Sequence, residues 1–159
     1  MSHLNKARIA IVGAGVSGLS CARILKQTFE NVTVFDKGRF SGGRLASRTR
    51  DQNQFDYGAQ YFTARSQSFK EIVESLVVSG HVSEWQGKIG RFKDNKFQPE
   101  GDSIVRYVGV PSMRTLAERL GEGIDCRFNH VVQSILKHGK RWTIDGFVKG
   151  LHDQKFSHE

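Results

Sequence analysis

The first third of the chain alternates between short apolar runs and one amphipathic stretch. Residues 8–12 form a run that is largely apolar and ends at a glycine, which is typical of a buried parallel strand. Residues 16–28 place apolar side chains at helical spacing, and residues 31–36 are rich in β-branched residues, which favours a second strand. A strand, a glycine turn, a helix and a strand within about 30 residues predict a βαβ unit.

Beyond this unit the pattern predicts a helix, a hairpin and a strand. Residues 67–78 carry apolar side chains on one side of a helix. Residues 87–97 indicate a β-hairpin that turns at Asp94-Asn95, and residues 104–110 read as a further strand.

A second helix and three strands are predicted near the C-terminus. Ser112 is the expected N-cap of a helix that ends at Gly121. From Gly146 onward the few apolar residues follow no period, so residues 146–159 are expected to be a frayed tail. The three short strand patterns lie at residues 126–129, 131–136 and 142–145.

Composition favours a globular, cytoplasmic protein. Hydrophobic residues make up 38% and charged residues 25% of the 159 residues. No apolar run approaches the roughly 20 residues that span a bilayer, and the polar first residues predict no signal peptide. Cys21 and Cys126 fall in different elements and form neither a metal-ligand pair nor a disulfide framework, so no metal site is expected and a cytosolic location is favoured. Because no apolar run is long enough, no membrane partner is expected either.

The net charge of +8 has two interpretations. Basic residues that crowd one loop form either a solvated surface or an attraction for phosphate-bearing ligands. Zinc-finger spacing, an RNP motif and helix-turn-helix cues are all missing, so nucleic acid is not expected as a partner. The basic residues of this loop are Lys37, Arg39, Arg44, Arg48 and Arg50.

The sequence Gly-Ala-Gly-Val-Ser-Gly at residues 13–18 matches G-x-G-x-x-G between the first strand and the helix. Gly13 permits a tight turn, Gly15 lets a pyrophosphate approach the backbone, and Gly18 lets the helix pack closely on the strand. The N–H groups at the helix N-terminus would bind phosphates, and Ser17 lies where it can add a hydrogen bond. In this context the motif predicts dinucleotide binding.

Two motifs after the second strand discriminate between dinucleotides. Asp36 lies close to the spacing of about 20 residues expected of the acid that binds the adenosine ribose, and it would repel the 2′-phosphate of NADP. The alternative is that Asp36 ends the strand and caps a turn. In the Ser-Gly-Gly-Arg sequence of residues 41–44, the glycines can bring N–H groups against a phosphate or ribityl chain, and Arg44 can contact the pyrophosphate. The alternative is an ordinary Gly-Gly turn with a solvated arginine.

Taken together, the chain resembles the FAD-binding amine-oxidase superfamily, and within it the renalase-like subgroup. The most specific part of the resemblance is Gly-Ala-Gln-Tyr at residues 58–61. In that family FAD lies extended along the nucleotide-binding domain, so the resemblance implies FAD as cofactor. The motifs that carry the resemblance are residues 9–18, 35–37, 41–44, 55–63, 107–113 and 129–135 with Trp142.

The resemblance also implies roles for single residues. Gln60 and Tyr61 would lie near the flavin end. Plain core packing is the alternative for the aromatic cluster of Tyr57, Tyr61 and Phe62. The backbone of Val132 would hold the adenine. The cofactor-binding residues implied in this way are Gly13, Gly15, Ser17, Gly18, Asp36, Lys37, Gly43, Arg44, Gln60, Tyr61 and Val132.

The expected fold class is α/β, with a Rossmann-like FAD-binding domain at residues 1–64 and 111–145. Residues 65–110 would be an inserted part of an α+β substrate domain. Family members run on past residue 159, so the chain is expected to be C-terminally truncated.

The resemblance implies an oxidoreductase. A dihydronicotinamide isomer of NAD(P)H would transfer a hydride to the flavin, which oxygen would then reoxidise. No catalytic residue is predicted, because the flavin carries the chemistry, and the truncated chain is expected to be weakly active or inactive alone. The alternatives are a flavin-dependent amine oxidase and a nucleotide-binding remnant without turnover.

Overall fold

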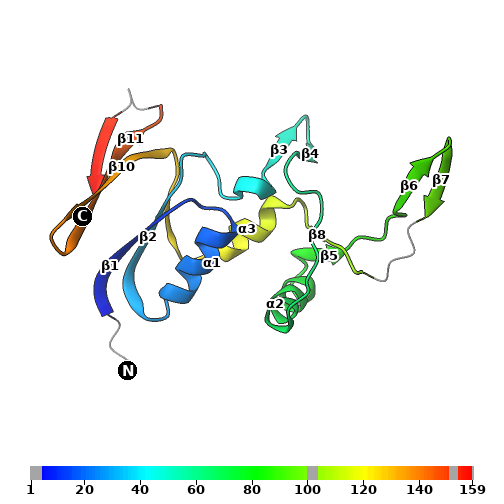
Figure 1. The fold of residues 1–159 in the computed structure, drawn as a ribbon, viewed down its shortest axis with the longest axis horizontal. Coiled ribbons are helices and arrows are strands. Elements are labelled where there is room, and N and C mark those ends of the chain that lie inside the picture. Colours follow the sequence, from blue (N-terminus) through cyan, green and yellow to red (C-terminus); the bar gives the residue numbers. More distant parts are fainter. Residues whose placement is uncertain (1–4, 100–103, 151–153, 159) are drawn as a thin grey trace.

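The computed structural model describes residues 5–99, 104–150 and 154–158, and its N-terminal part contains the predicted βαβ unit (Figure 1). Strands β1 (Asn5–Val12), β2 (Phe29–Phe35) and β9 (Asp125–Arg127) form a parallel sheet in the order β1-β2-β9. Helix α1 (Val16–Leu25) connects β1 to β2, and α3 (Arg114–Leu120) lies beside α1. The predicted Rossmann-like fold class is therefore confirmed, with α1 ending three residues earlier than expected.

The core of this part lies between the two helices and one face of the sheet. Leu19 and Ala22 of α1 pack against Val32 and Val34 of β2, and Ala117 of α3 completes the cluster. Residues 32–35 of β2 are buried without alternation, because both faces of this strand are covered. Such burial on both faces is typical of a strand in a parallel sheet.

The other face of β2 is covered by a second, antiparallel sheet. Its strands are β10 (His130–His138), β11 (Arg141–Val148) and β12 (Gln154–His158), in that order. The ring of Phe35 stacks on the ring of Phe156, with centroids 5.5 Å apart and planes 5° apart. A layer of helices, a parallel sheet and an antiparallel sheet thus follow one another.

This arrangement corrects the expectation of a frayed tail for residues 146–150 and 154–158, whereas residues 151–153 and 159 lie outside the described residues. Gly146 lies within β11, and β12 pairs with β11 along its length. Phe156 and His158, two residues apart, both contact Phe35, so the strand has a period of two that is too short to stand out in the sequence. An added Cβ at Gly146 would clash with the carbonyl oxygen of Val131, so the close approach of β11 to β10 requires glycine at this position.

The remaining elements form smaller units between the two halves of the Rossmann-like part. Helix α2 (Gln67–Val78) has the predicted bounds, and the predicted hairpin is formed by β6 (Gly90–Lys93) and β7 (Lys96–Pro99). Asp94 and Asn95 at its turn have φ of 51° and 58°, as a two-residue hairpin turn requires. The other elements are η1 (Gly43–Leu45), β3 (Ser47–Arg50), β4 (Asn53–Asp56), β5 (Val82–Glu84) and β8 (Tyr107–Gly109).

Candidate dinucleotide-binding site

The glycine turn between β1 and α1 has the geometry that its three glycines predict. Gly13 has a φ of 107°, which favours glycine, and an added Cβ at Gly18 would lie 2.0 Å from the carbonyl oxygen of Gly13. At Gly15, by contrast, the nearest atom to an added Cβ is the carbonyl oxygen of Gly42, 4.0 Å away. Gly18 is therefore required for packing, whereas the backbone of Gly15 borders open space into which a ligand can come.

The N-terminus of α1 carries no side-chain cap. Its N-cap residue is Gly15, whose extended backbone makes no side-chain hydrogen bond, and the first turn contains no acidic residue. The first N–H groups of a helix lack partners within the helix and carry a partial positive charge. The N–H groups of Val16, Ser17 and Gly18 belong to this turn, which is suited to an anion such as a pyrophosphate.

The second glycine motif lies directly against the first. The Gly42 N–H donates to the Ala14 carbonyl at 2.9 Å, and Gly15 and Gly42 form an isolated parallel β-bridge. Gly42 and Gly43 have φ of 130° and 55°, so the turn between them requires glycine. The two motifs, far apart in the sequence, form one backbone cradle, and the exposed Arg44 lies next to it.

Asp36 follows β2 at the same edge of the sheet. One carboxylate oxygen accepts a hydrogen bond from the Ala14 N–H and the other from the Gly38 N–H, both at 2.6 Å. Asp36 thus caps the turns on both sides, as the simpler of its two interpretations expects. Each oxygen keeps lone-pair capacity for a further donor, so the ribose interpretation is compatible with this geometry.

The start of β10 is fixed to the same edge. The His130 N–H donates to the Asp36 carbonyl at 2.9 Å, and the Asn129 N–H donates to the Gly38 carbonyl at 2.8 Å. Val132, two residues along β10, is half-buried and lies opposite Gly146 of β11. Lys37 is exposed beside Asp36. Val132 and Lys37 therefore lie on the β10 side of the cradle.

Gln60 and Tyr61 lie on the other side. The Ala59 N–H donates to the Arg44 carbonyl at 2.8 Å, and an added Cβ at Gly58 would lie 2.2 Å from the same oxygen. This contact brings Gln60 and Tyr61 close to the Gly-Gly loop, with both side chains exposed.

The exposure of Tyr61 separates the aromatic cluster into two kinds of residue. The Tyr61 ring lies against Trp85, with centroids 5.5 Å apart, and the Arg106 guanidinium lies over it at 5.6 Å. Phe62, which packs half-buried against Tyr107 and Phe69, is the cluster's core residue. The core-packing alternative therefore applies to Phe62 and not to Tyr61.

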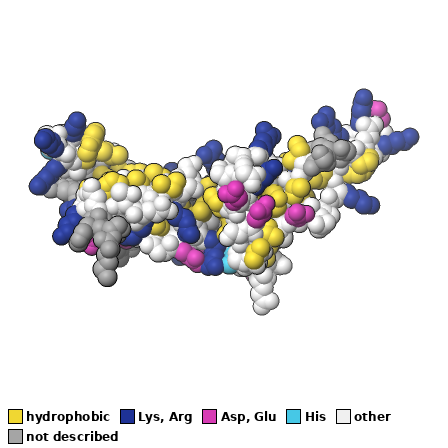
Figure 2. Space-filling view, turned by 90° about the horizontal axis from the view of Figure 1, so that it is seen from below, with side chains coloured by type: hydrophobic (Ala, Val, Ile, Leu, Met, Phe, Trp, Pro, Cys, Tyr) yellow, Lys and Arg dark blue, Asp and Glu magenta, His cyan; other side chains and the backbone are white. Residues whose placement is uncertain are grey.

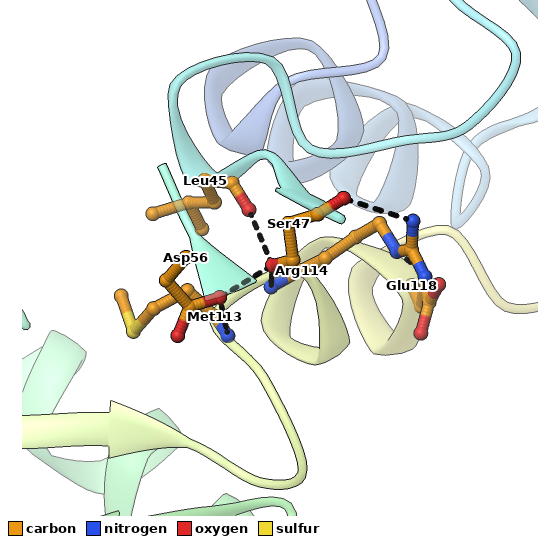
Figure 3. Close-up of polar contacts among 6 residues, drawn as sticks. All are labelled: Leu45, Ser47, Asp56, Met113, Arg114 and Glu118. Atoms are coloured by element: carbon orange, nitrogen blue, oxygen red, sulfur yellow. Dashed lines mark hydrogen bonds and ion pairs between the residues drawn. The ribbon is translucent and has the colours of Figure 1, made fainter. Parts of the chain in front are cut away.

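A polar network that the sequence did not indicate holds the cradle to α3 (Figure 3). Asp56 of β4 accepts hydrogen bonds from the Ser47 hydroxyl, at 2.5 Å, and from the Met113 N–H, at 3.0 Å. The Ser47 hydroxyl oxygen in turn accepts from the Arg114 N–H at 3.2 Å. The carboxylate and the hydroxyl thus satisfy N–H groups at the start of α3.

This network corrects the expected N-cap of α3. The N-cap residue is Met113 and not Ser112, and its side chain makes no cap hydrogen bond. The N–H groups at the start of α3 donate instead to Asp56 and Ser47 of the β3–β4 hairpin. The Arg114 side chain pairs with Glu118 at 2.9 Å and lies over the Phe40 ring at 4.8 Å. Short-range sequence patterns give no signal for such a cap, since Asp56 lies far from α3 in the sequence.

Two side chains on the strands that adjoin the cradle, Cys126 and His158, have shifted pKa values. Burial, with Asp125 and Asp36 nearby, raises the pKa of the Cys126 thiol above its ordinary value, so it stays protonated at neutral pH. Burial, with Arg8 and Arg127 nearby, lowers the pKa of His158, and Asp125 opposes this shift.

Within the described ranges no group of three or more His, Cys, Asp and Glu residues could hold a metal ion. No helix among the same residues is long and apolar enough to cross a membrane.

Comparison with known proteins gives one family and several partial relatives. The model of the NAD(P)-binding Rossmann-like domain matches residues 11–76. Mouse renalase is 28% identical over 153 residues, which cover 87% of this chain and 42% of renalase. Mitochondrial protoporphyrinogen oxidase of Nicotiana tabacum is 39% identical over 74 residues, or 46% of this chain and 15% of the relative.

Coproporphyrinogen III oxidase of Staphylococcus aureus is 32% identical over 108 residues, which cover 65% of this chain and 22% of the relative. A structure of putrescine oxidase matches 98% of this chain and 57% of that chain with a TM-score of 0.67, at 13% identity, so it supports the fold alone. The chain spans less than half the length of these curated relatives.

Proposed function

We propose that the chain belongs to the flavin amine-oxidase superfamily, that it binds FAD along the cradle and that it serves a flavin-dependent oxidoreductase. The observation that carries the proposal is the joining of the two glycine motifs. The Gly42 N–H donates to the Ala14 carbonyl, and a Cβ added at Gly43 would lie 3.5 Å from the Gly15 Cα, so the two backbones are in contact. A lone glycine turn is common, whereas two that meet at an uncapped helix N-terminus are suited to an extended diphosphate.

Each part of FAD has a set of residues suited to it. The pyrophosphate would bind at the N–H groups of residues 16–18 and at Arg44, because both carry positive charge. The ribose hydroxyls would donate to Asp36, the adenine would lie against Val132, and the flavin ring would lie toward Gln60 and Tyr61. Lys37 would remain near the adenosine phosphate as a mobile charge.

The substrate we propose is a small molecule that donates a hydride, namely a dihydronicotinamide isomer of NAD(P)H. The similarity to mouse renalase extends over 87% of this chain, which favours this substrate class over the others. FAD supplies the electron acceptor when it is bound, and the protein orients the donor against it. An amine is the second candidate, because the amine-oxidase alternative that the sequence left open is compatible with a fold that putrescine oxidase shares over 98% of this chain.

Two further expectations belong to this proposal. Residues 65–110 would be part of a substrate domain, supported by α2, β5 and β8, which pack on one another beside the Rossmann-like part. The location would be the cytoplasm.

The two glycines of the turn provide a matched test of the cofactor. Gly15 has a φ of −85° and open space around it, so Gly15→Ala should fold normally and obstruct the approach of the pyrophosphate. We expect FAD affinity to fall by about tenfold or more, equivalent to about 1.4 kcal/mol. Gly18→Ala should instead impair folding itself. Circular dichroism measures the fold, and titration with quenching of flavin fluorescence measures the affinity.

Arg44 supplies the second test, with Arg50 as its control. Arg44→Ala should weaken FAD binding by about 1.5–3 kcal/mol, the range for hydrogen bonds to charged groups. Arg50→Ala makes the same charge change on the exposed end of β3 and should have little effect. Unchanged FAD affinity in both Gly15→Ala and Arg44→Ala, or tight NADP binding without flavin, would contradict the proposal. Anaerobic flavin reduction by dihydronicotinamides, compared with putrescine, distinguishes the two substrate classes.

A further inference from the structure

The Gly-Gly loop of the cradle, residues 40–43, depends on its neighbours for its shape. Gly42 and Gly43 have φ of 130° and 55°, and glycine loses more conformational freedom on ordering than any other residue. The Gly42 N–H donates to the Ala14 carbonyl at 2.9 Å, which fixes one side of the loop against the glycine turn. Another side of the loop faces α3, and the contact there comes from Arg114.

Arg114, the first residue of α3, contacts the Gly-Gly loop with both parts of its side chain. A Cβ added at Gly42 would lie 3.4 Å from the Arg114 Cγ, so the aliphatic part of the side chain covers the loop backbone. The guanidinium lies over the Phe40 ring at 4.8 Å, nearer than that of Arg39 at 5.9 Å. One side chain of α3 therefore holds two residues of the loop.

The nitrogen atoms of Arg114 are engaged within the protein. Nη1 donates to the Ser47 carbonyl at 3.4 Å, and Nε forms an ion pair with Glu118 at 2.9 Å (Figure 3). The Arg114 side chain is 19% exposed. A covered guanidinium paired with a carboxylate is suited to holding a loop, whereas the exposed Arg44 is suited to contacting a ligand.

Arg114 is itself held in place from two directions. Its backbone N–H donates to the Ser47 hydroxyl at 3.2 Å, which ties it to the β3–β4 hairpin. Leu45, which follows the loop, is buried against Met113 and Leu116 at the start of α3. The loop is thus attached to a well-packed helix, and a loop that is ordered beforehand loses less freedom when a ligand binds.

We propose that Arg114 is a positioning residue for the cofactor, one that sets the Gly-Gly loop in its binding shape before FAD arrives. The inference rests on the proposed function of the cradle. Arg114 acts through Phe40 and Gly42 and does not touch the ligand. Its contribution to affinity is the conformational freedom that the loop no longer has to lose on binding.

Arg114→Met tests the proposal, with Arg119→Met as the matched control. Methionine keeps an unbranched side chain against Gly42 and removes the guanidinium from Phe40. Arg119 makes a comparable ion pair, with Glu122, at the end of the same helix. We expect Arg114→Met to bind FAD about five- to tenfold more weakly, and Arg119→Met to bind it as the wild type does. Quenching of flavin fluorescence measures the affinity.

AMP separates positioning from a merely structural role. It carries the adenosine and one phosphate, so it would occupy the Asp36 side of the cradle without reaching the Gly-Gly loop. Arg114→Met should therefore bind AMP within about twofold of the wild type, measured by isothermal titration calorimetry. If both ligands bind more weakly in step with a lower urea midpoint, the role of Arg114 is structural and the proposal is overturned.

Salt separates positioning from direct contact with a phosphate, because screening weakens the attraction between an exposed cation and an anion. The fold-change in FAD affinity between the wild type and Arg114→Met should be the same at low and at high salt. A fold-change that shrinks toward one at high salt would assign Arg114 to the phosphate and overturn the proposal.

Phe40→Leu supplies a second variant, which should fold normally because the ring is 58% exposed. Since Arg114 acts through Phe40, the double variant should bind FAD within about twofold of the weaker single variant. Losses that multiply would overturn the proposal, and so would unchanged FAD affinity in Phe40→Leu if Arg114→Met does not fold. A wild-type chain that binds no FAD contradicts the proposed function as well, whereas equal FAD binding by the wild type and Arg114→Met contradicts this inference alone.

Discussion

Hydrophobic side chains are buried in the Rossmann-like part and exposed in the β6–β7 hairpin. Leu19 of α1 is 0% exposed, held between the sheet and α3, whereas Phe92 of β6 is 76% exposed. The hairpin lies at one end of the molecule, away from the cradle, and Figure 2 shows hydrophobic side chains among Lys and Arg near this end. The first region is stabilised by contacts between distant segments, and the second by its own strand pairing.

The difference follows from the number of covered faces. Residues of β2 are buried on both sides, since helices lie on one face and β10–β12 on the other. In the β6–β7 hairpin the rings of Phe92 and Phe97 contact each other, with centroids 6.4 Å apart, and both remain exposed. A two-stranded hairpin is marginally stable in water by itself, so this region is a candidate for contact with further protein.

The largest expected effect is a loss of stability that one region shows and the other does not. Leu19→Ala should lower the free energy of unfolding by about 2–5 kcal/mol, because it leaves a cavity in the core. Phe92→Ala should change it by less than about 0.5 kcal/mol, because an exposed ring has little packing to lose. Urea unfolding followed by circular dichroism compares the two variants. Equal losses would mean that the hairpin is packed as firmly as the core.

The network around Asp56 should give the next largest effect, since it joins the hairpin β3–β4 to α3. Asp56→Ala leaves the Met113 N–H and the Ser47 hydroxyl without their acceptor, which should destabilise the protein by about 1–3 kcal/mol. Glu74→Ala, at an exposed position of α2, is the control for the loss of a carboxylate and should change stability little. If both variants unfold at the same urea concentration, the network does not fix α3.

The elements that depend on local pattern were predictable from the sequence. The bounds of α2, the turn at Asp94-Asn95 and the βαβ unit all follow from periodicity and turn chemistry, and the structure confirms them. The β3–β4 hairpin, interpreted as loop, and β12, interpreted as frayed, escaped prediction. Both depend on partners distant in the sequence: Ser47 and Asp56 on α3, and Phe156 on Phe35.

The candidate site divides in the same way. The glycine turn and Asp36 could be located from spacing alone, because they lie within one βαβ unit. The sequence could not predict the bridge between Gly42 and Gly15 or the packing of Gly58 on the Arg44 carbonyl. Both are contacts between loops that are distant in the sequence. The roles assigned to Gln60, Tyr61 and Val132 stay predictions, which flavin titration of single variants would test.

The position of β12 sets where the firmly packed region ends. Phe156 stacks on Phe35 and contacts the His130 ring at 4.9 Å, so Phe156→Ala should destabilise the protein by about 1–2 kcal/mol, less than a fully buried aromatic would. Ser157→Ala, on the exposed side of the same strand, is the matched control. Amide exchange measures the same boundary. Rapid amide exchange throughout β12, with no loss of stability in Phe156→Ala, would mean that β12 is frayed, as the sequence pattern predicted.

The smallest expected effect is a pH dependence at the end of β12. Burial and the nearby Arg8 and Arg127 lower the pKa of folded His158 below its ordinary value of 6.5, with Asp125 acting in the opposite sense. The unfolded chain therefore takes up a proton at His158 before the folded chain does. Stability from this residue is full above pH 6.5 and is lost as the pH falls through 6.5 toward the lower folded pKa.

His158→Gln removes this titration and should flatten the stability difference between about pH 7.5 and pH 5.5, the range that spans histidine titration. The measurement is the urea midpoint at both values, with His138→Gln, at the far end of β10, as the matched control. An unchanged pH dependence in His158→Gln would mean that the second sheet meets β1 and β2 more loosely than the ring contact between His158 and Phe35 indicates. The firmly packed region would then end at β11, and β12 would behave more like the β6–β7 hairpin than like the core.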